Sequence, residues 1–116
     1  TLAGLRAKAK EETGYLALDG DRIVGCIFCA ERPDSFYVGK LAIAADHQRS
    51  GLGYALMQHA EALALRAGKS ALELQVRVEL SGNQSAFARM GFVEIARTSH
   101  AGYDRPTSIT MRKALN

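Results

Sequence analysis

The spacing of apolar residues along the chain changes repeatedly between two periods. Short runs that alternate with polar residues, or are continuously apolar, predict strands at residues 15–18, 23–30, 36–43, 71–76, 92–97 and 107–112. Leu56, Ala60 and Leu63 recur every three or four residues, which predicts a long helix over residues 53–67. A shorter helix is expected over residues 81–90. A glycine follows each of these helices, as is common at helix ends.

The first residues of the chain also favour a helix. Leu2 and Leu5 lie three residues apart, and Gly14 follows as a residue at which helices commonly stop. We therefore expect residues 2–12 to form the end of a helix. Because the chain starts at Thr1 rather than at a methionine, we also expect that an N-terminal strand or helix of the fold is missing from this sequence.

The order of these elements predicts one α/β domain over residues 1–116. Residues 19–22 contain an Asp-Gly step that is typical of a hairpin turn, so the first strands form an antiparallel meander. A strand–helix–strand crossover follows, then the shorter helix and a closing hairpin. The sheet is therefore expected to be mixed, mostly antiparallel, and flanked by helices. The closing strand near residues 107–112 is expected to be an exposed edge, which favours a homodimer.

The composition is that of an ordinary soluble globular protein, with 47% hydrophobic and 23% charged residues. The apolar runs are far shorter than the about 20 residues of a membrane-spanning helix, and no signal peptide is recognisable. We therefore expect a cytoplasmic protein that does not bind membranes. The net charge of +3 suits an anionic ligand. The basic residues are scattered among acidic ones, which argues against nucleic acid as a partner.

Cys26 and Cys29 form a Cys-x-x-Cys pair within the predicted strand at residues 23–30. Residues three apart in a strand point to opposite faces, whereas a redox pair lies at a helix start. A zinc site would need a second pair of ligands, and the three histidines are too far apart in the sequence to supply it. We interpret both cysteines as structural thiols and expect no metal.

The most informative segment joins the strand that ends near Ile43 to the helix that begins near Gly53. The first amides of a helix have no partners within it and lie at the positive end of its dipole. Gly51 and Gly53 let the backbone approach an anion closely. This turn therefore suits a phosphate or a pyrophosphate.

Two other phosphate-binding loops fit less well. A Walker A loop needs Lys and then Ser or Thr after the glycines, where this chain has Tyr54 and Ala55. A dinucleotide-binding turn needs a third small residue where Leu56 stands, and it follows the first strand of a parallel sheet. On the glycines alone, an ordinary strand-to-helix loop remains an alternative.

Residues 48–53, Gln-Arg-Ser-Gly-Leu-Gly, resemble the Q/R-x-x-G-x-G/A signature of the GNAT N-acetyltransferase family. Residues 21–25 (DRIVG) are similar to the g-x-i-V-G hairpin of that family. Residues 86–92 (AFARMGF) are similar to its short helix that leads into Gly-Phe and a strand. The resemblance covers residues 13–113. It implies a GNAT-type fold, with acetyl-coenzyme A (acetyl-CoA) as the acetyl donor.

The resemblance implies cofactor contacts in three places. Backbone amides of residues 49–54 would hold the pyrophosphate of coenzyme A, and the strand at residues 41–43 would pair with its pantetheine arm. Side chains of the later helix would approach the pantetheine or the nucleotide. The implied cofactor-binding residues are Leu41, Ala42, Ile43, Gln48, Arg49, Ser50, Gly51, Leu52, Gly53, Tyr54, Asn83, Phe87 and Arg89.

The catalytic residues depart from the family pattern. Many members carry a tyrosine four residues before the glycine of Gly-Phe, where it can protonate the leaving thiolate. This chain has Phe87 there, and a phenyl ring donates no proton. The expected donors are Ser85, Tyr103 or water. The strand before the turn carries no carboxylate. The candidate general base is therefore Glu73, on the predicted strand at residues 71–76, or Glu79, in the loop after that strand.

Three functions fit the sequence. The first is acetyl-CoA-dependent N-acetylation, by direct transfer to a primary amine of a small molecule or a protein, as the resemblance implies. The second is a non-catalytic acyl-CoA-binding or regulatory module on the same fold, favoured by Phe87 and by the lack of an evident base. The third is a protein-interaction domain with an empty cleft.

Overall fold

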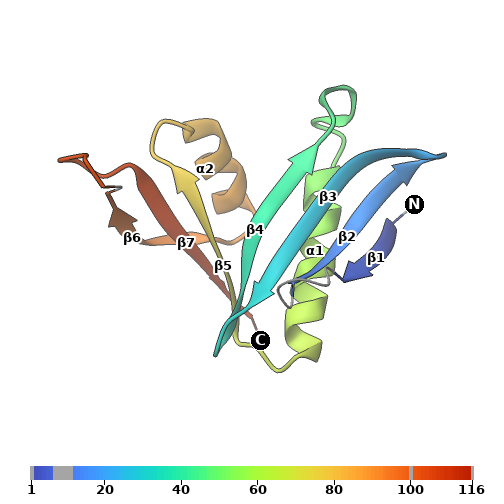
Figure 1. Cartoon of the computed structure of the whole chain (residues 1–116), viewed down its shortest axis with the longest axis horizontal. Coiled ribbons are helices and arrows are strands. Elements are labelled where there is room, and N and C mark those ends of the chain that lie inside the picture. Colours follow the sequence, from blue (N-terminus) through green and yellow to red (C-terminus); the bar gives the residue numbers. More distant parts are fainter. Residues whose placement is uncertain (1, 7–11, 100, 116) are drawn as a thin grey trace.

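The computed structural model of the chain describes residues 2–6, 12–99 and 101–115. Within them the backbone forms one sheet of seven strands in the order β1-β2-β3-β4-β5-β7-β6 (Figure 1). Its described pairs are antiparallel except β4 with β5. The elements are β1 (Leu2–Arg6), β2 (Glu12–Asp19), β3 (Arg22–Glu31), β4 (Ser35–Ile43), the 3-10 helix η1 (Ala45–His47), α1 (Leu52–Arg66), β5 (Ala71–Arg77), α2 (Ser81–Arg89), β6 (Val93–Thr98) and β7 (Ser108–Ala114).

The mixed, mostly antiparallel α/β fold confirms the prediction from the hydrophobic pattern. Each strand predicted after residue 14 overlaps an observed strand, and both predicted helices are present. The crossover β4–α1–β5 makes these two strands parallel. Helix α1 packs across strands β2 to β5. Its buried residues are Leu56, Met57, Ala60 and Ala64.

The N-terminal segment is a strand, so the predicted helix over residues 2–12 is wrong. β1 pairs antiparallel with β2 along its whole length. Hydrogen bonds to a neighbouring strand outweigh the weak helical preference of so short a segment, which Gly4 lowers further. Gly14, expected to stop the helix, is buried within β2. Residues 7–11 of the predicted helix lie outside the described residues.

The closing strand is not an exposed edge, which corrects the expectation for residues 107–112. β7 lies between β5 and β6 and pairs with both. Thr107, Ser108, Ile109 and Met111 are all buried. The local pattern of β7 does not reveal that it inserts beside β5 and leaves β6 as the edge. A homodimer through an exposed β7 is therefore excluded, and the homodimer itself stays a prediction.

β4 leaves its parallel neighbour halfway along its length. The pairing with β5 ends at Val38 and Leu74, although both strands continue. At the same point the register between β3 and β4 shifts by one residue, which leaves Gly39 as the extra residue of a bulge. Gly39 thus lies at a bend in β4. Beyond it the two strands open into a V (Figure 1).

Candidate functional site

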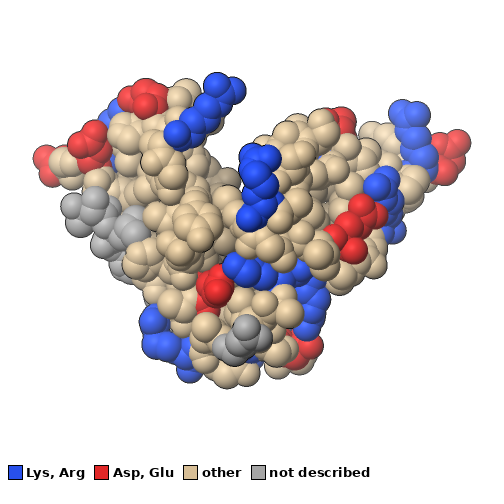
Figure 2. Space-filling view, turned by 180° about the vertical axis from the view of Figure 1, so that it is seen from behind, with Lys and Arg blue, Asp and Glu red and all other residues tan. Residues whose placement is uncertain are grey.

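A cleft of about 800 Å³ opens where β4 diverges from β5. One wall is the turn before α1 with the start of that helix, and the other wall is α2. Seen from behind, the molecule is notched, and basic side chains stand on both sides of the notch (Figure 2). We call this hollow the central cleft. Its lining residues are Leu41, Ile43, His47, Gln48, Arg49, Gly51, Gly53, Tyr54, Gly82, Asn83, Ala86, Phe87, Arg89 and Met90.

The central cleft brings together the strand, the turn and the later helix that the sequence implies for a cofactor. Ala42, Ser50 and Leu52 are the implied residues that do not line it. Ser50 and Leu52 instead line a second hollow on the other side of the turn. His47, Gly82, Ala86 and Met90 line the cleft but are absent from the sequence-based set. Helical spacing from Asn83 and Phe87 could have indicated Ala86 and Met90.

β4 turns backbone groups toward the cleft. The backbone groups of successive residues in a strand point alternately to its two sides. The Ala44 N–H donates to the Val24 carbonyl of β3 at 2.8 Å. This alternation directs the backbone groups of Ala42 to β3, and those of Leu41 and Ile43 to the side from which β5 has diverged. An extended ligand can pair with such an edge.

The turn before α1 leaves its amides available to a ligand. Arg49 (φ 64°) and Gly51 (φ 85°) both adopt left-handed backbone conformations. The helix hydrogen bonds begin with the Ala55 N–H, which donates to the Gly51 carbonyl at 3.0 Å. Among the described residues, no side chain caps α1, and its first turn contains no acidic residue. The N–H groups of residues 52–54 and the positive end of the helix dipole can therefore bind an anion.

Gly51 and Gly53 keep space open beside these amides. A Cβ atom at Gly51 would meet nothing within 4 Å, and one at Gly53 would meet only Ile43 Cγ1, at 4.0 Å. Packing of the protein itself therefore does not require glycine at Gly53. The open space fits a ligand that approaches the backbone closely.

Gly25 of β3 lets the turn sit close to the sheet. A Cβ atom there would lie 3.2 Å from both Ile43 Cδ1 and Leu52 Cδ2. These two side chains pack against the bare backbone of β3, and Leu52 thereby anchors the start of α1. The glycine of the DRIVG segment thus has a packing role that the sequence does not reveal.

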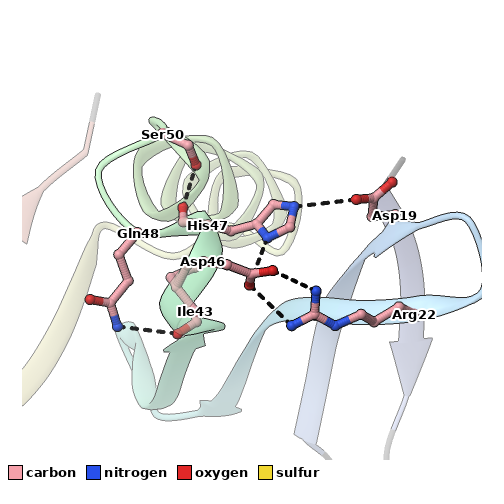
Figure 3. Close-up of polar contacts among 7 residues, drawn as sticks. All are labelled: Asp19, Arg22, Ile43, Asp46, His47, Gln48 and Ser50. Carbon is pink, nitrogen blue, oxygen red and sulfur yellow. Dashed lines mark hydrogen bonds and ion pairs between the residues drawn. The ribbon is translucent and has the colours of Figure 1, made fainter.

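Two polar side chains of the turn contact nearby backbone (Figure 3). The Gln48 side-chain amide donates to the Ile43 carbonyl at 3.4 Å, and the Ser50 hydroxyl donates to the His47 carbonyl at 2.5 Å. Both contacts stabilise the path of the turn. They leave its N–H groups as the donors for a ligand.

The α2 wall is formed by side chains. Asn83, Phe87 and Met90 lie about one helical turn apart and share the side of α2 that lines the cleft. The Phe87 ring packs edge-on against the Phe92 ring, with 6.0 Å between their centroids. Arg89 adds a positive charge to this wall.

Glu73, the predicted general base, is engaged outside the lining of the central cleft. Its carboxylate pairs with Arg112 of β7, which also contacts Asp34 at 3.1 Å. These two carboxylates, Glu73 first, raise the pKa of Arg112 above its ordinary value. The alternative base Glu79 has a pKa lowered by a backbone hydrogen bond and by Arg77, which makes it a weaker base.

The two predicted proton donors also lie outside the lining. Ser85 is exposed, and it follows Asn83 by two residues, so it points away from the cleft face of α2. Tyr103 is 58% exposed in the loop between β6 and β7. The catalytic roles of Glu73, Ser85 and Tyr103 stay predictions.

The cysteines and histidines add one unexpected contact. Cys29 is buried and Cys26 half-buried on β3, as structural thiols would be. His59 is exposed, but His47 contacts the carboxylates of Asp19 and Asp46, although no sequence pattern indicates these partners. His100 lies outside the described residues.

Within the described part of the chain, no three His, Cys, Asp or Glu side chains are grouped to hold a metal ion. No described helix is long and apolar enough to cross a membrane.

The chain matches the model of the acetyltransferase (GNAT) family over residues 3–92. This match covers most of its length, and the chain belongs to that family. A sequence search of curated proteins found no match.

Similar solved structures include several proteins named as acetyltransferases. The ribosomal-protein-S18-alanine N-acetyltransferase from Escherichia coli has a TM-score of 0.80 and 21% identity, over 93% of this chain and 72% of that one. A GNAT family acetyltransferase from Elizabethkingia anophelis with acetyl-CoA bound has a TM-score of 0.76 and 17% identity, over 90% and 76%. The NatC complex bound to Gag peptide and CoA has a TM-score of 0.77 and 22% identity, over 89% and 71%. These similarities show a shared fold, and the family supports an N-acetyltransferase.

Proposed function

We propose that the chain transfers an acetyl group from acetyl-CoA directly to a primary amine of a small molecule or a protein, in the central cleft. The observation that carries this proposal is that one cleft joins the outward-facing strand edge at Leu41 and Ile43 to the uncapped start of α1. The pantetheine arm fits the first feature and the pyrophosphate fits the second. Both belong to the same ligand.

The walls of the cleft complement the charge of this ligand. Arg49 stands on the α1 wall and Arg89 on the α2 wall, so the phosphates would enter between two cations. The amides of residues 49–54 would hold the pyrophosphate, and the pantetheine would run along β4. The backbone N–H groups of Leu41 and Ile43 are donors for its amide groups and for the thioester carbonyl.

The proposed reaction needs little chemistry from side chains. The amine nitrogen forms a bond to the acetyl carbon and the carbon–sulfur bond breaks. The amine loses one proton and the thiolate takes up one. Holding the two reactants in register can supply about 7–11 kcal/mol of the barrier. Water, Glu73, Ser85 or Tyr103 would then need only to move protons.

Isothermal titration calorimetry with acetyl-CoA tests binding, and thiol release on a panel of primary amines tests transfer. We expect saturable binding and turnover on at least one amine. No heat of binding at millimolar acetyl-CoA would overturn the proposal. Saturable binding without turnover on small amines or peptides would identify the alternative, an acyl-CoA-binding module. Phe87 and the absence of the three predicted catalytic side chains from the cleft lining favour that alternative.

A further inference from the structure

The turn before α1 is hollowed on two sides. Its residues line the central cleft on one side and, through Ser50 and Gly51, a second hollow of about 520 Å³ beside β2 and β3 on the other. The 3-10 helix η1, which precedes the turn, contains no buried residue. Apolar packing therefore does not fix residues 45–51, and polar contacts must hold them in place.

Four side chains join this segment to the β2–β3 hairpin (Figure 3). The Arg22 guanidinium donates two hydrogen bonds to the Asp46 carboxylate, at 2.7 and 3.0 Å. His47 Nδ1 lies 3.1 Å from Asp46 Oδ1, and His47 Nε2 lies 3.4 Å from Asp19 Oδ2. Asp19 and Arg22 face each other where β2 ends and β3 begins. We call Asp19, Arg22, Asp46 and His47 the hairpin clasp.

Both ring nitrogens of His47 face carboxylates, one from β2 and one from η1. A neutral imidazole has one N–H and one lone pair, so it donates to only one of them. The imidazolium donates to both.

His47 also links the hairpin clasp to the turn. Its carbonyl accepts the hydrogen bond from the Ser50 hydroxyl. Between these two residues Arg49 adopts φ 64°, which costs a non-glycine residue about 1 kcal/mol or more. Such a conformation persists where its surroundings hold it. The hairpin clasp on one side and Ser50 on the other restrain this strained residue.

We propose that the hairpin clasp is a positioning unit, which keeps the amides of residues 49–54 directed into the central cleft. This inference rests on the proposed function. It makes the affinity for coenzyme A depend on Arg22 and Asp46, which do not line the central cleft. The pKa of Asp46 is held well below its usual range by Arg22 first and then by His47, so this partner stays charged.

Arg22→Gln tests the positioning role against a matched control. Arg97→Gln removes another exposed arginine that makes two hydrogen bonds to one carboxylate, Glu94, at 2.6 and 3.2 Å on the edge strand β6. Exposed pairs contribute little to stability, so both variants should unfold near the wild-type temperature. By calorimetry with CoA, we expect Arg22→Gln to bind roughly fivefold more weakly and Arg97→Gln to bind as wild type. Equal affinities of the two variants would overturn the inference.

Steady-state kinetics on an amine that wild type acetylates give a readout that a general loss of structure would not. We expect Arg22→Gln to raise the KM for acetyl-CoA about fivefold, with kcat within about twofold of wild type. Asp46→Asn breaks the same pair from η1 and should behave alike, so the test stands even if Arg22→Gln fails to fold. A fall in kcat with unchanged KM in both variants would contradict the inference. If wild type binds no CoA, the proposed function fails first; if it binds and the variants do not differ from it, only the clasp proposal fails.

Discussion

The two walls of the central cleft are built from different chemistry. The α1 wall offers backbone groups, because Gly51 and Gly53 carry no side chain and the amides of residues 52–54 have no cap. The α2 wall offers the side chains of Asn83, Phe87 and Arg89. A binding site made of backbone groups requires particular residues, here glycine, at only a few positions. A wall made of side chains can be altered by single substitutions without loss of the fold.

This contrast separates binding from catalysis. The features that suit a pyrophosphate lie almost wholly on the α1 wall, where they depend on backbone conformation. The position of the proton donor in many relatives lies on the α2 wall, where Phe87 stands. We therefore expect changes that fill the space beside the amides of the α1 wall to affect affinity most, and a change at Phe87 of the α2 wall to affect the rate more than the affinity.

Gly53→Leu should give the largest effect. Gly53 has no positive φ and lies in the first turn of α1, so a side chain there leaves the helix intact and fills the space beside the amides. We expect CoA affinity to fall at least about 100-fold, with an unfolding temperature no lower than that of wild type. Gly53→Ala is the control, since the family signature accepts alanine, and it should bind within about threefold of wild type. Tight binding by Gly53→Leu in calorimetry would show that the cofactor lies elsewhere.

Gly25→Val tests how the α1 wall is anchored. Its added methyl groups would push against Ile43 and Leu52, which already lie 3.2 Å from an added Cβ. We expect the free energy of unfolding to fall by about 1–3 kcal/mol, with a smaller loss for Gly25→Ala. Urea denaturation followed by circular dichroism measures both. If Gly25→Val were as stable as wild type, Leu52 would not be what holds the turn.

Arg89→Gln tests the α2 wall, with Arg49→Gln as its counterpart on the α1 wall. Each removes one of the two facing cations, so we expect CoA affinity about fivefold weaker at low ionic strength. The difference from wild type should shrink as salt screens exposed charges. Calorimetry at two salt concentrations tests this. A salt-independent loss would show that the guanidinium acts by shape and not by charge.

Phe87→Tyr tests whether a proton donor at this position of the α2 wall can take part in the reaction. Phe87 is half-buried in the cleft lining, and a tyrosine differs from it by a single hydroxyl. On an amine that wild type acetylates, we expect kcat to rise about threefold, because the thiolate gains a donor. CoA affinity should stay within about twofold of wild type. A fall in kcat with unchanged affinity would exclude this position as a place for the acid.

The smallest expected effect is that of acid on stability through Asp46, a member of the hairpin clasp behind the α1 wall. The pKa of Asp46 is lowered in the folded state, chiefly by Arg22, so its contribution to stability is present above the ordinary aspartate pKa of about 3.9. That contribution is lost as the pH falls through the lower folded-state value. We expect wild type to unfold at a slightly higher temperature than Asp46→Asn at pH 6. The difference should narrow steadily below pH 4, and a difference that grows there would contradict the ion pair.

Sequence patterns predicted those parts of the fold that depend on local chemistry. The meander, the crossover helix and the glycine turn follow from hydrophobic period and turn residues. The placement of β7 beside β5 could not be predicted, because strand order depends on long-range pairing that leaves no local pattern. The pattern at Leu2–Arg6 predicts a helix where the structure has a strand for the same reason: the partner of this strand is β2, and its own apolar spacing is ambiguous.

The candidate site divides in the same way. The turn can be predicted because glycines and a strand–loop–helix order mark it, whereas the strand edge is implied only by the resemblance to the GNAT family. The hairpin clasp was not, since Arg22 and Asp46 lie 24 residues apart and meet only in the folded chain. The pairing of Glu73 with Arg112 was also hidden. The sequence alone does not reveal whether a given carboxylate is paired with a cationic side chain in the folded chain.

The most direct test of where coenzyme A binds is a titration of ¹⁵N-labelled protein with CoA, followed by amide NMR signals. We expect the largest shifts at residues 49–54 of the turn, with smaller ones at Leu41 and Ile43 of β4. Signals from the edge strand β6 should not move. Shifts centred away from the turn, or none at saturating CoA, would contradict the claim that backbone amides at the start of α1 hold the cofactor.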